Sequence, residues 1–290
     1  MFVSVRLKKA TIVALCLLLV ILITLGVKGP ETVKESVKKI TSVEVPVISY
    51  NNIVKEESLW GDDALSPVEL EKDIIWLLEH GYETVSIGEL ISYVNGTSDL
   101  PGKPVVLTFD DGYYSSFCYV LPLLEKYKIK ATVSVVGSYS EFACEEASPS
   151  PLSSYLDWED IIEMRKTGLV EFANQTYDLN RRDDRKGVAM LENETYEDYR
   201  HIFLTDVFKT QHLLEENCKL SPCIFTYPFG VTCEAGERLV KNSGFQASLS
   251  KEPKINYLSR DNEACLYNMG RFNRPAFVST EDFMKEYEIE

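Results

Sequence analysis

The sequence predicts a parallel α/β domain that follows a membrane-spanning helix. An uncharged apolar segment lies near the N-terminus, and beyond residue 46 short apolar runs alternate with capped helical patterns to the end of the chain. This alternation is typical of a single parallel sheet or (β/α) barrel covered by helices. The 290 residues would suffice for two ordinary domains. Because the alternation is continuous, we expect one domain over residues 46–290.

The charge of the chain restricts the classes of partner. Lys and Arg number 30 while Asp and Glu number 45, which gives a formal net charge of −15. The hydrophobic fraction of 45% excludes general disorder. Phosphate binding needs a basic surface, so we expect no nucleic-acid partner.

Residues 10–27 form an uncharged stretch of 18 apolar or small residues. At about 1.5 Å per residue, a helix of this length nearly spans a hydrocarbon core of about 30 Å. Arg6, Lys8 and Lys9 precede the stretch, so the positive-inside rule places residues 1–9 in the cytoplasm. We therefore predict a single-pass anchor in the cell membrane with an extracytoplasmic C-terminal domain.

Two other interpretations of this stretch compete with the anchor. A buried core helix would show a polar stripe, which the stretch lacks. A cleaved signal peptide is the stronger alternative, although Thr24-Leu25-Gly26 is a poor cleavage site and the apolar run is long. Residues 28–45 are polar and charged, with Pro30 near their start, and predict a tether.

Six of the seven cysteines lie in the predicted extracytoplasmic body, where disulfides form. Cys218, Cys223 and Cys233 cluster around one predicted strand, so we predict at least one bridge among them. Cys118 lies in an apolar helical stretch, which favours a buried free thiol.

Cap and turn signals set the bounds of the predicted elements. Ser66, Pro67 and Glu69 form a capping-box pattern, and Gly81 ends the helix that it begins. Asp157 caps a later helix in the same way. We predict strands at 46–50, 105–109, 131–136, 170–173, 223–227 and 245–249, and helices at 67–80, 86–96, 113–127, 157–166, 196–217, 234–242 and from 279 onward.

Polar segments follow three of these strands, where chemistry gathers in parallel α/β folds. They are TFDDG (108–112), NQTYDLN (174–180) and TYPFG (226–230). Of the adjacent carboxylates Asp110 and Asp111, one can hold a cation while the other serves as a base. A lone Asp-Asp-Gly would also fit an Asx turn. Tyrosines near these segments could stack on sugar rings or simply pack: Tyr113, Tyr114 and Tyr177.

With these motifs the chain resembles the polysaccharide deacetylases, the family with a NodB-homology domain (carbohydrate esterase family 4). It is most similar to the branch that includes membrane-anchored poly-N-acetylglucosamine deacetylases. The resemblance covers about residues 46–290 and implies a single NodB-like distorted (β/α) barrel. It rests on PVISYNNI (46–53), LPGKPVVLTFDDGYYSS (100–116), LVEFANQTYDL (169–179), FTYPFG (225–230) and GRFNRP (270–275).

The resemblance implies hydrolysis of acetamido groups in N-acetylated polysaccharides, assisted by one divalent metal ion, Zn²⁺. By motif, Asp110 would be the general base and Asp111 a metal ligand. The backbone N–H of Tyr227 would be a candidate donor to the oxyanion of the tetrahedral intermediate. The residues implied in substrate binding are Gly112, Tyr227, Pro228 and Phe229.

The chain departs from the family pattern at the metal ligands. Relatives carry His-Thr-x-x-x-His where this chain has Gln175 and Asn180, and they tend to carry Tyr-His where it has Tyr50-Asn51. An amide oxygen is a weak, neutral ligand for Zn²⁺. We therefore predict weak or absent zinc binding, although Asp111 and the two amides could hold Ca²⁺ or Mg²⁺ loosely.

The only histidines are His80, His201 and His212, and all three fall in helical patterns. We predict that they are surface or packing residues rather than ligands. Three functions remain open: a working deacetylase with an unusual metal shell, a catalytically silent relative that binds glycan, and a partner-binding membrane protein with a vestigial groove.

Overall fold

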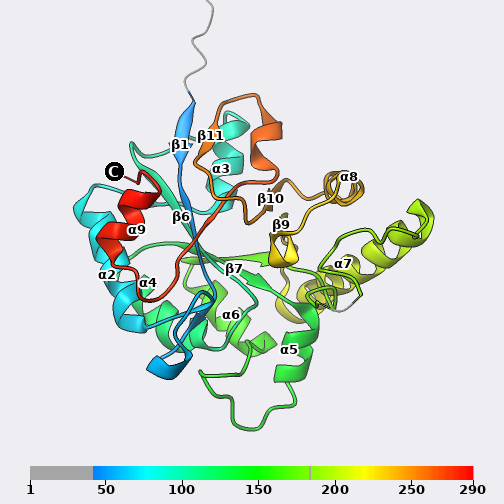
Figure 1. The fold of residues 1–290 in the computed structure, drawn as a ribbon, viewed down its shortest axis with the longest axis horizontal. Helices are drawn as coiled ribbons and strands as arrows, with labels where there is room; N and C mark the ends of the chain where they lie inside the picture. The colour runs from blue at the N-terminus through cyan, green and yellow to red at the C-terminus, as the bar shows by residue number, and fades with distance from the viewer. Residues whose placement is uncertain (1–41, 183, 290) are drawn as a thin grey trace, which may run out of the picture. The chain divides into compact units, whose positions relative to one another are not determined.

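The computed structural model of this chain describes residues 42–182 and 184–289 (Figure 1). The predicted membrane segment, residues 10–27, lies outside these ranges, as does most of the predicted tether. Within the described ranges, no helix has the length and apolar character needed to cross a membrane. The N-terminal anchor therefore stays a prediction.

A parallel sheet forms the centre of the domain, as predicted. In the described residues it has eight strands in the order β10-β9-β8-β7-β6-β2-β12, with β5 also paired to β6. All of its pairings are parallel. The strands are β2 (Val47–Tyr50), β5 (Glu83–Thr84), β6 (Pro104–Phe109), β7 (Ala131–Val135), β8 (Val170–Asn174), β9 (Ile224–Thr226), β10 (Ala247–Leu249) and β12 (Phe272–Asn273).

The central strands are buried because their residues are apolar or small. Every residue of β6 and β7 is buried, as expected of a parallel sheet that is covered on both faces. In the register of the sheet, Phe109 of β6 lies beside Tyr50 of β2 and Val133 of β7. The segments that follow these strands therefore emerge at the same edge of the sheet.

Residues 269–273 contact both edges of the sheet. Met269 forms a parallel bridge with Leu249 of β10, and Phe272 pairs with Ile48 of β2. These contacts are one or two residues long, so the sheet is a distorted barrel that is only partly closed, a half-barrel. Two small sheets lie outside it and are too short for sequence periodicity to reveal: antiparallel β1 (Val43–Val45) with β11 (Asn256–Leu258), and parallel β3 (Asn52–Ile53) with β4 (Ala64–Leu65).

Helices with a cap signal match their predicted ranges closely. The Ser66 hydroxyl accepts the Glu69 N–H at the start of α2 (Pro67–Glu79), and Gly81, with a φ of 78°, follows its end. Asp157 and Asp160 form a capping box at the start of α6 (Trp158–Lys166). The other predicted helices are α3 (Ile87–Val94), α7 (Tyr196–Cys218), α8 (Glu234–Asn242) and α9 (Thr280–Glu286).

The helix predicted over 113–127 begins later. It starts as a π-helical segment, η2 (Ser116–Val120), and continues as α4 (Leu121–Tyr127). The delay arises because a left-handed turn precedes it. Segments that the sequence does not predict are α5 (Gly137–Ala143) and the short 3₁₀ helices η1 (Glu57–Leu59), η3 (Pro228–Gly230) and η4 (Glu263–Leu266).

The prediction of a disulfide among Cys218, Cys223 and Cys233 is wrong. All six cysteines of the described residues have free thiols. Cys218 packs in one hydrophobic cluster, Cys223 against a second and Cys233 against a third. Although these residues are close in sequence, Cys218 ends α7 whereas Cys223 and Cys233 lie on either side of β9, and each side chain enters a different cluster.

Candidate active site

A pocket of about 260 Å³ lies beyond the carboxyl ends of the strands. Asn51 follows β2, Asp110 and Asp111 follow β6, and Gln175 and Asn180 follow β8. The parallel sheet therefore brings these five side chains together, as the sequence predicts. The other lining residues are Asp63, Tyr113, Tyr139, Tyr155, Arg182, Phe229 and Lys251.

A left-handed turn places the two aspartates at the pocket. Asp111 and Gly112 both have a φ of 65°, a conformation that glycine adopts without steric cost. A Cβ at Gly112 would lie 3.2 Å from Cγ1 of Val135, so the turn packs closely against β7. Gly112 thus shapes the site through its backbone and does not itself line the pocket.

Both amides bind the second aspartate. Gln175 Nε2 and Asn180 Nδ2 donate to the same oxygen, Asp111 Oδ1, at 2.8 and 2.9 Å. The backbone N–H of Asp111 donates to Gln175 Oε1 at 2.9 Å. This last bond fixes the orientation of the Gln175 amide, and the carboxylate oxygen fixes that of Asn180, because only N–H groups can donate to it.

Helix α7 holds the loop that carries the two amides. The Asp206 carboxylate accepts the backbone N–H groups of Tyr177 and Asp178 at 2.7 and 2.8 Å. Asn174 Nδ2 donates to the carbonyl oxygen of Val207 at 3.0 Å. These bonds fix the path of the loop and thus the direction of both amide side chains.

These residues do not fit the zinc ion that the family pattern implies. Both amides turn N–H groups toward Asp111 Oδ1, and Gln175 Oε1 already accepts the Asp111 N–H. Zinc in proteins is bound by imidazole nitrogen, thiolate sulfur and carboxylate oxygen. Residues 42–182 and 184–289 contain no group of three or more His, Cys, Asp or Glu side chains that could hold a metal ion.

The pKa of Asp111 is raised to about 6, mainly by burial and then by the neighbouring charge of Asp110. Hydrogen bonds from Asn180 and Gln175 oppose this shift, as does the positive charge of Lys251. The Asp111 carboxylate is therefore mostly ionised at pH 7.

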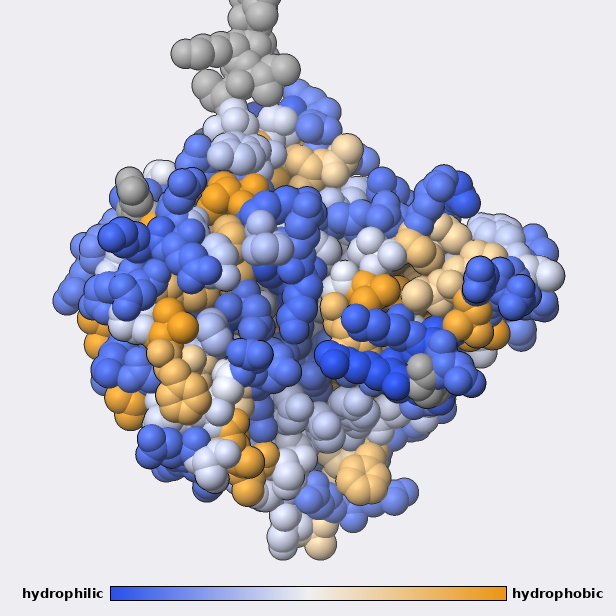
Figure 2. All heavy atoms as spheres, viewed as in Figure 1, coloured by the Kyte–Doolittle hydropathy of each residue, from blue (hydrophilic) through white to orange (hydrophobic). Residues whose placement is uncertain are grey.

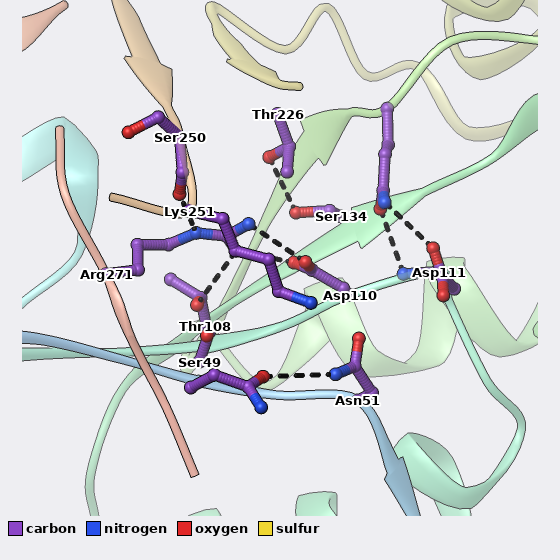
Figure 3. A network of polar contacts seen from close by, with 12 residues as sticks. Ser49, Asn51, Thr108, Asp110, Asp111, Ser134, Thr226, Ser250, Lys251 and Arg271 are labelled. Atoms are coloured by element: carbon purple, nitrogen blue, oxygen red, sulfur yellow. Dashed lines mark hydrogen bonds and ion pairs between the residues drawn. The ribbon is translucent and has the colours of Figure 1, made fainter. Parts of the chain in front are cut away.

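Asp110 is held by an arginine to which the sequence assigns no role. Arg271 Nη1 and Nη2 donate to Asp110 Oδ1 and Oδ2 at 2.6 and 2.9 Å (Figure 3). Arg271 also donates to the carbonyl of Ser250 at 2.8 Å and to the hydroxyl of Thr108 at 3.3 Å. Its side chain is fully buried. The sequence signal that could have identified Arg271 is its position in the GRFNRP segment.

The roles predicted for Tyr227 and Pro228 need correction. The Tyr227 side chain is buried in the core, and its backbone N–H donates to Leu249 O at 3.0 Å. Tyr227 is therefore neither a groove wall nor a free oxyanion donor, because it pairs with the neighbouring strand. Pro228 is buried outside the pocket lining. Phe229 does line the pocket, with the Arg182 guanidinium 4.4 Å from its ring centre.

Three aromatic rings form one wall of the pocket. Tyr155 stacks on Tyr113 and Tyr139, with ring centroids 5.1 and 4.3 Å away. Of these, the sequence places only Tyr113 near the site. Tyr139 and Lys251 shortly follow strands β7 and β10, a position that could have identified them, whereas Tyr155 lies in a loop without such a signal.

The three histidines lie on helices or at a helix end, away from the pocket, as predicted. His80 stacks on Trp76 at 3.7 Å between ring centroids, and His201 is exposed on α7. His212, on the same helix, lies 3.3 Å from a carboxylate oxygen of Glu216. None of the three is among the residues that line the pocket.

Comparison with known proteins decides the family. The polysaccharide deacetylase profile matches residues 97–248, which are more than half of the chain. The chain belongs to this family.

Curated polysaccharide deacetylases share part of this sequence. The chain is 26% identical over 202 residues to the poly-beta-1,6-N-acetyl-D-glucosamine N-deacetylase of Escherichia coli, which covers 63% of this chain and 30% of that protein. It is 27% identical over 192 residues to the enzyme of the same name from Staphylococcus aureus, which covers 66% and 62%. The chain thus spans less than two thirds of either relative.

Solved structures confirm the fold. A de-N-acetylase from Aggregatibacter actinomycetemcomitans superposes with a TM-score of 0.72 at 25% identity, over 84% of this chain and all of that one. IcaB from Ammonifex degensii gives a TM-score of 0.67 at 23% identity, over 84% and 96%. This member of the polysaccharide deacetylase family therefore has the parallel-sheet half-barrel of NodB-like proteins.

Proposed function

We propose that this polysaccharide deacetylase binds N-acetylated cell-surface glycan in its pocket and that its metal-dependent hydrolysis is impaired or lost. The names of the Escherichia coli and Staphylococcus aureus relatives support a poly-N-acetylglucosamine type of substrate. Peptidoglycan offers the same acetamido group and is the second candidate. A vestigial groove in a partner-binding protein is the remaining alternative.

The observation that carries this proposal is the hydrogen bonding of Asp111. The two positions that hold histidine in the family pattern, Gln175 and Asn180, donate N–H groups to its carboxylate. A cation at this point would have to displace both bonds and would meet amide hydrogens. Disturbing even an outer partner of a metal ligand typically costs about 10–100-fold in affinity or activity. Replacing two direct ligands should cost more.

The remaining residues supply only part of the chemistry of amide hydrolysis. Such hydrolysis needs an activated water, a base and donors to the developing oxyanion. Asp110 stands where the base is expected, but Arg271 holds both of its oxygens. The Tyr227 N–H is already bonded to Leu249 O. Without a metal ion, nothing lowers the pKa of the attacking water, so we expect slow or no turnover.

The pocket is nevertheless suited to a sugar. Its lining combines carboxylates, amides, cations and the stacked tyrosines, and aromatic faces pack well against apolar faces of rings. The molecular face shown in Figure 2 is mainly hydrophilic, with hydrophobic residues in small separate groups. This surface favours a polar ligand over an apolar one.

We also propose that residues 10–27 anchor the protein in the cell membrane with the pocket outside. The uncharged run and its basic flank support this placement. The full-length protein should stay in the membrane after alkaline carbonate washing, and external protease should reach its domain. A mature N-terminus near Val27 in secreted material would show a cleaved signal instead.

Metal analysis combined with an acetate-release assay tests the catalytic part of the proposal. The purified protein should carry little zinc and release little or no acetate from N-acetylglucosamine oligomers or peptidoglycan. One tightly held zinc ion per chain together with turnover would overturn impaired catalysis and establish a working deacetylase.

The double variant Gln175→His and Asn180→His should recover zinc binding, because the loop already directs both side chains at Asp111. Activity should recover only in part, since catalytic groups act as a unit and Asn51 stays uncorrected. Adding Asp111→Ala should abolish the recovered binding. The control Asn217→His with Gln246→His adds two histidines at exposed positions and should not create the site.

A further inference from the structure

Lys251 is an accessible cation in the pocket. Its side chain lines the pocket and is 32% exposed, and its Nζ lies 3.7 Å from Asp63 Oδ1. Asp63 is itself 69% exposed, and an exposed ion pair of this kind contributes little to stability. The contact with Asp63 therefore does not explain why an ammonium group lines the same pocket as Asp110 and Asp111.

The backbone of Lys251 is tightly held. A Cβ on Gly230 would lie 2.1 Å from Lys251 Cβ and 2.6 Å from its backbone nitrogen, so the two segments touch. The carbonyl oxygen of the preceding residue, Ser250, accepts a hydrogen bond from Arg271 Nε. The Ser250 N–H donates a hydrogen bond to Met269 O at 2.9 Å. The backbone of Lys251 is thus fixed next to Ser250, which also binds Arg271, while its ammonium group reaches the pocket and touches the exposed Asp63.

Two charged groups of the pocket, Lys251 and Asp111, keep a donor and an acceptor for a ligand. Arg271 is buried and fully engaged with Asp110, Ser250 and Thr108. Asp111 Oδ1 takes both amides, whereas its Oδ2 accepts no hydrogen bond from residues 42–182 or 184–289. The pocket therefore offers the Lys251 ammonium as a donor and Asp111 Oδ2 as an acceptor.

A secondary amide needs this combination, since its carbonyl accepts and its N–H donates. We propose that Lys251 binds the acetamido carbonyl oxygen of the glycan while Asp111 accepts the acetamido N–H, in a site that works without a metal ion. The inference rests on the proposed function and names the residues that would recognise the acetyl group.

Binding of an N-acetylglucosamine pentamer and of its de-N-acetylated counterpart, measured calorimetrically in EDTA, tests this role. The wild-type protein should bind the acetylated pentamer with EDTA present. Lys251→Met should weaken that binding about 10–100-fold, the usual worth of a hydrogen bond to a charged group. Lys251→Arg keeps a cationic donor and should recover most of it. Lys254→Met, at an exposed lysine paired with Glu252 outside the pocket lining, is the matched control and should change nothing.

The de-N-acetylated pentamer separates recognition from a merely structural role. It lacks the carbonyl and carries ammonium groups that Lys251 repels, so Lys251→Met should leave its binding unchanged or strengthen it. Equal weakening of both ligands, wild-type affinity in Lys251→Met, or loss of wild-type binding in EDTA would each overturn the role of Lys251. If the wild-type protein binds neither pentamer even with zinc, the proposed function fails as well. Thermal melting checks that each variant folds.

Discussion

Two buried arginine–aspartate pairs come from the short segment 270–275, and they have different surroundings. Arg274 donates Nε and Nη2 to Asp73 at 2.9 and 3.1 Å, and both side chains are fully enclosed. Asp73 also accepts the hydroxyls of Tyr50 and Thr280 at 3.2 and 2.6 Å. Arg271 makes the same bidentate pair with Asp110, but Asp110 borders the pocket.

The difference shows that the same kind of ion pair can either stabilise the fold or orient a carboxylate in a pocket. Asp73 lies on α2, and its donors come from Tyr50 of β2, from Arg274 and from Thr280 of α9, so the pair ties the C-terminal segment to the domain. Burial raises the pKa of Asp73, while Arg274, Thr280 and Tyr50 lower it. At Asp110 the arginine holds the carboxylate in a fixed direction while one side stays open to a ligand.

The largest expected effect comes from breaking the enclosed pair. Arg274→Ala should lower the free energy of unfolding by about 3–5 kcal/mol, because Asp73 is left as an uncompensated buried charge. Urea unfolding followed by circular dichroism measures this loss. A loss below about 1 kcal/mol would mean that Asp73 is not held as an ion in the folded protein.

Breaking the Arg271–Asp110 pair at the pocket should lower the free energy of unfolding by a smaller amount. Arg271→Ala should lower the free energy of unfolding by about 1–3 kcal/mol, the penalty of an unmade buried hydrogen bond, because pocket water can reach Asp110. The same urea experiment gives a direct comparison. A cost equal to that of Arg274→Ala would show that the two pairs are equally sealed.

A third carboxylate, Glu171, sharpens the comparison because its hydrogen-bond donors are uncharged. It accepts the N–H groups of Ile87 and Gly88 and the hydroxyl of Thr132. Burial raises its pKa from 4.5 to about 7, against the effect of these bonds. The folded state thus holds the proton more tightly than the unfolded state, so this contribution to stability is full below about pH 4.5 and is lost as the pH rises through about 7.

Glu171→Gln should remove that pH dependence. Between pH 5 and 8 the wild-type protein should lose on the order of 2–3 kcal/mol more stability than the variant. Thermal or urea unfolding at several pH values measures the difference. Parallel stability profiles of the two proteins would contradict the raised pKa.

Local signals in the sequence were sufficient for much of the fold. Ser66 and Asp157 mark helix starts because a cap is a contact between residues three apart, and α8 has the predicted bounds. The strands β11 and β12 escape notice because two or three residues show no period. The left-handed turn at Asp111 delays the helix after it, which a helical pattern alone does not reveal.

The site residues also divide into those that the sequence places correctly and those that it does not. Asp110, Asp111, Gln175, Asn180 and Phe229 could be placed at one pocket from the sequence, because they follow strands of a parallel sheet and the chain resembles a known family. Which way a side chain points after a strand was not predictable from sequence, and Tyr227 therefore enters the core instead of the groove.

The sequence by itself determined the sheet, the helices with caps and the loss of imidazole at the metal-ligand positions, because each depends on residue type and short spacing. Only the tertiary structure decided which side chains bind the two aspartates in the absence of the histidines. The amides bind Asp111 across 64 and 69 residues, and Arg271 reaches Asp110 across 161. Contacts over such separations form only when the whole sheet has assembled, and Lys251 joins Asp111 at the pocket for the same reason.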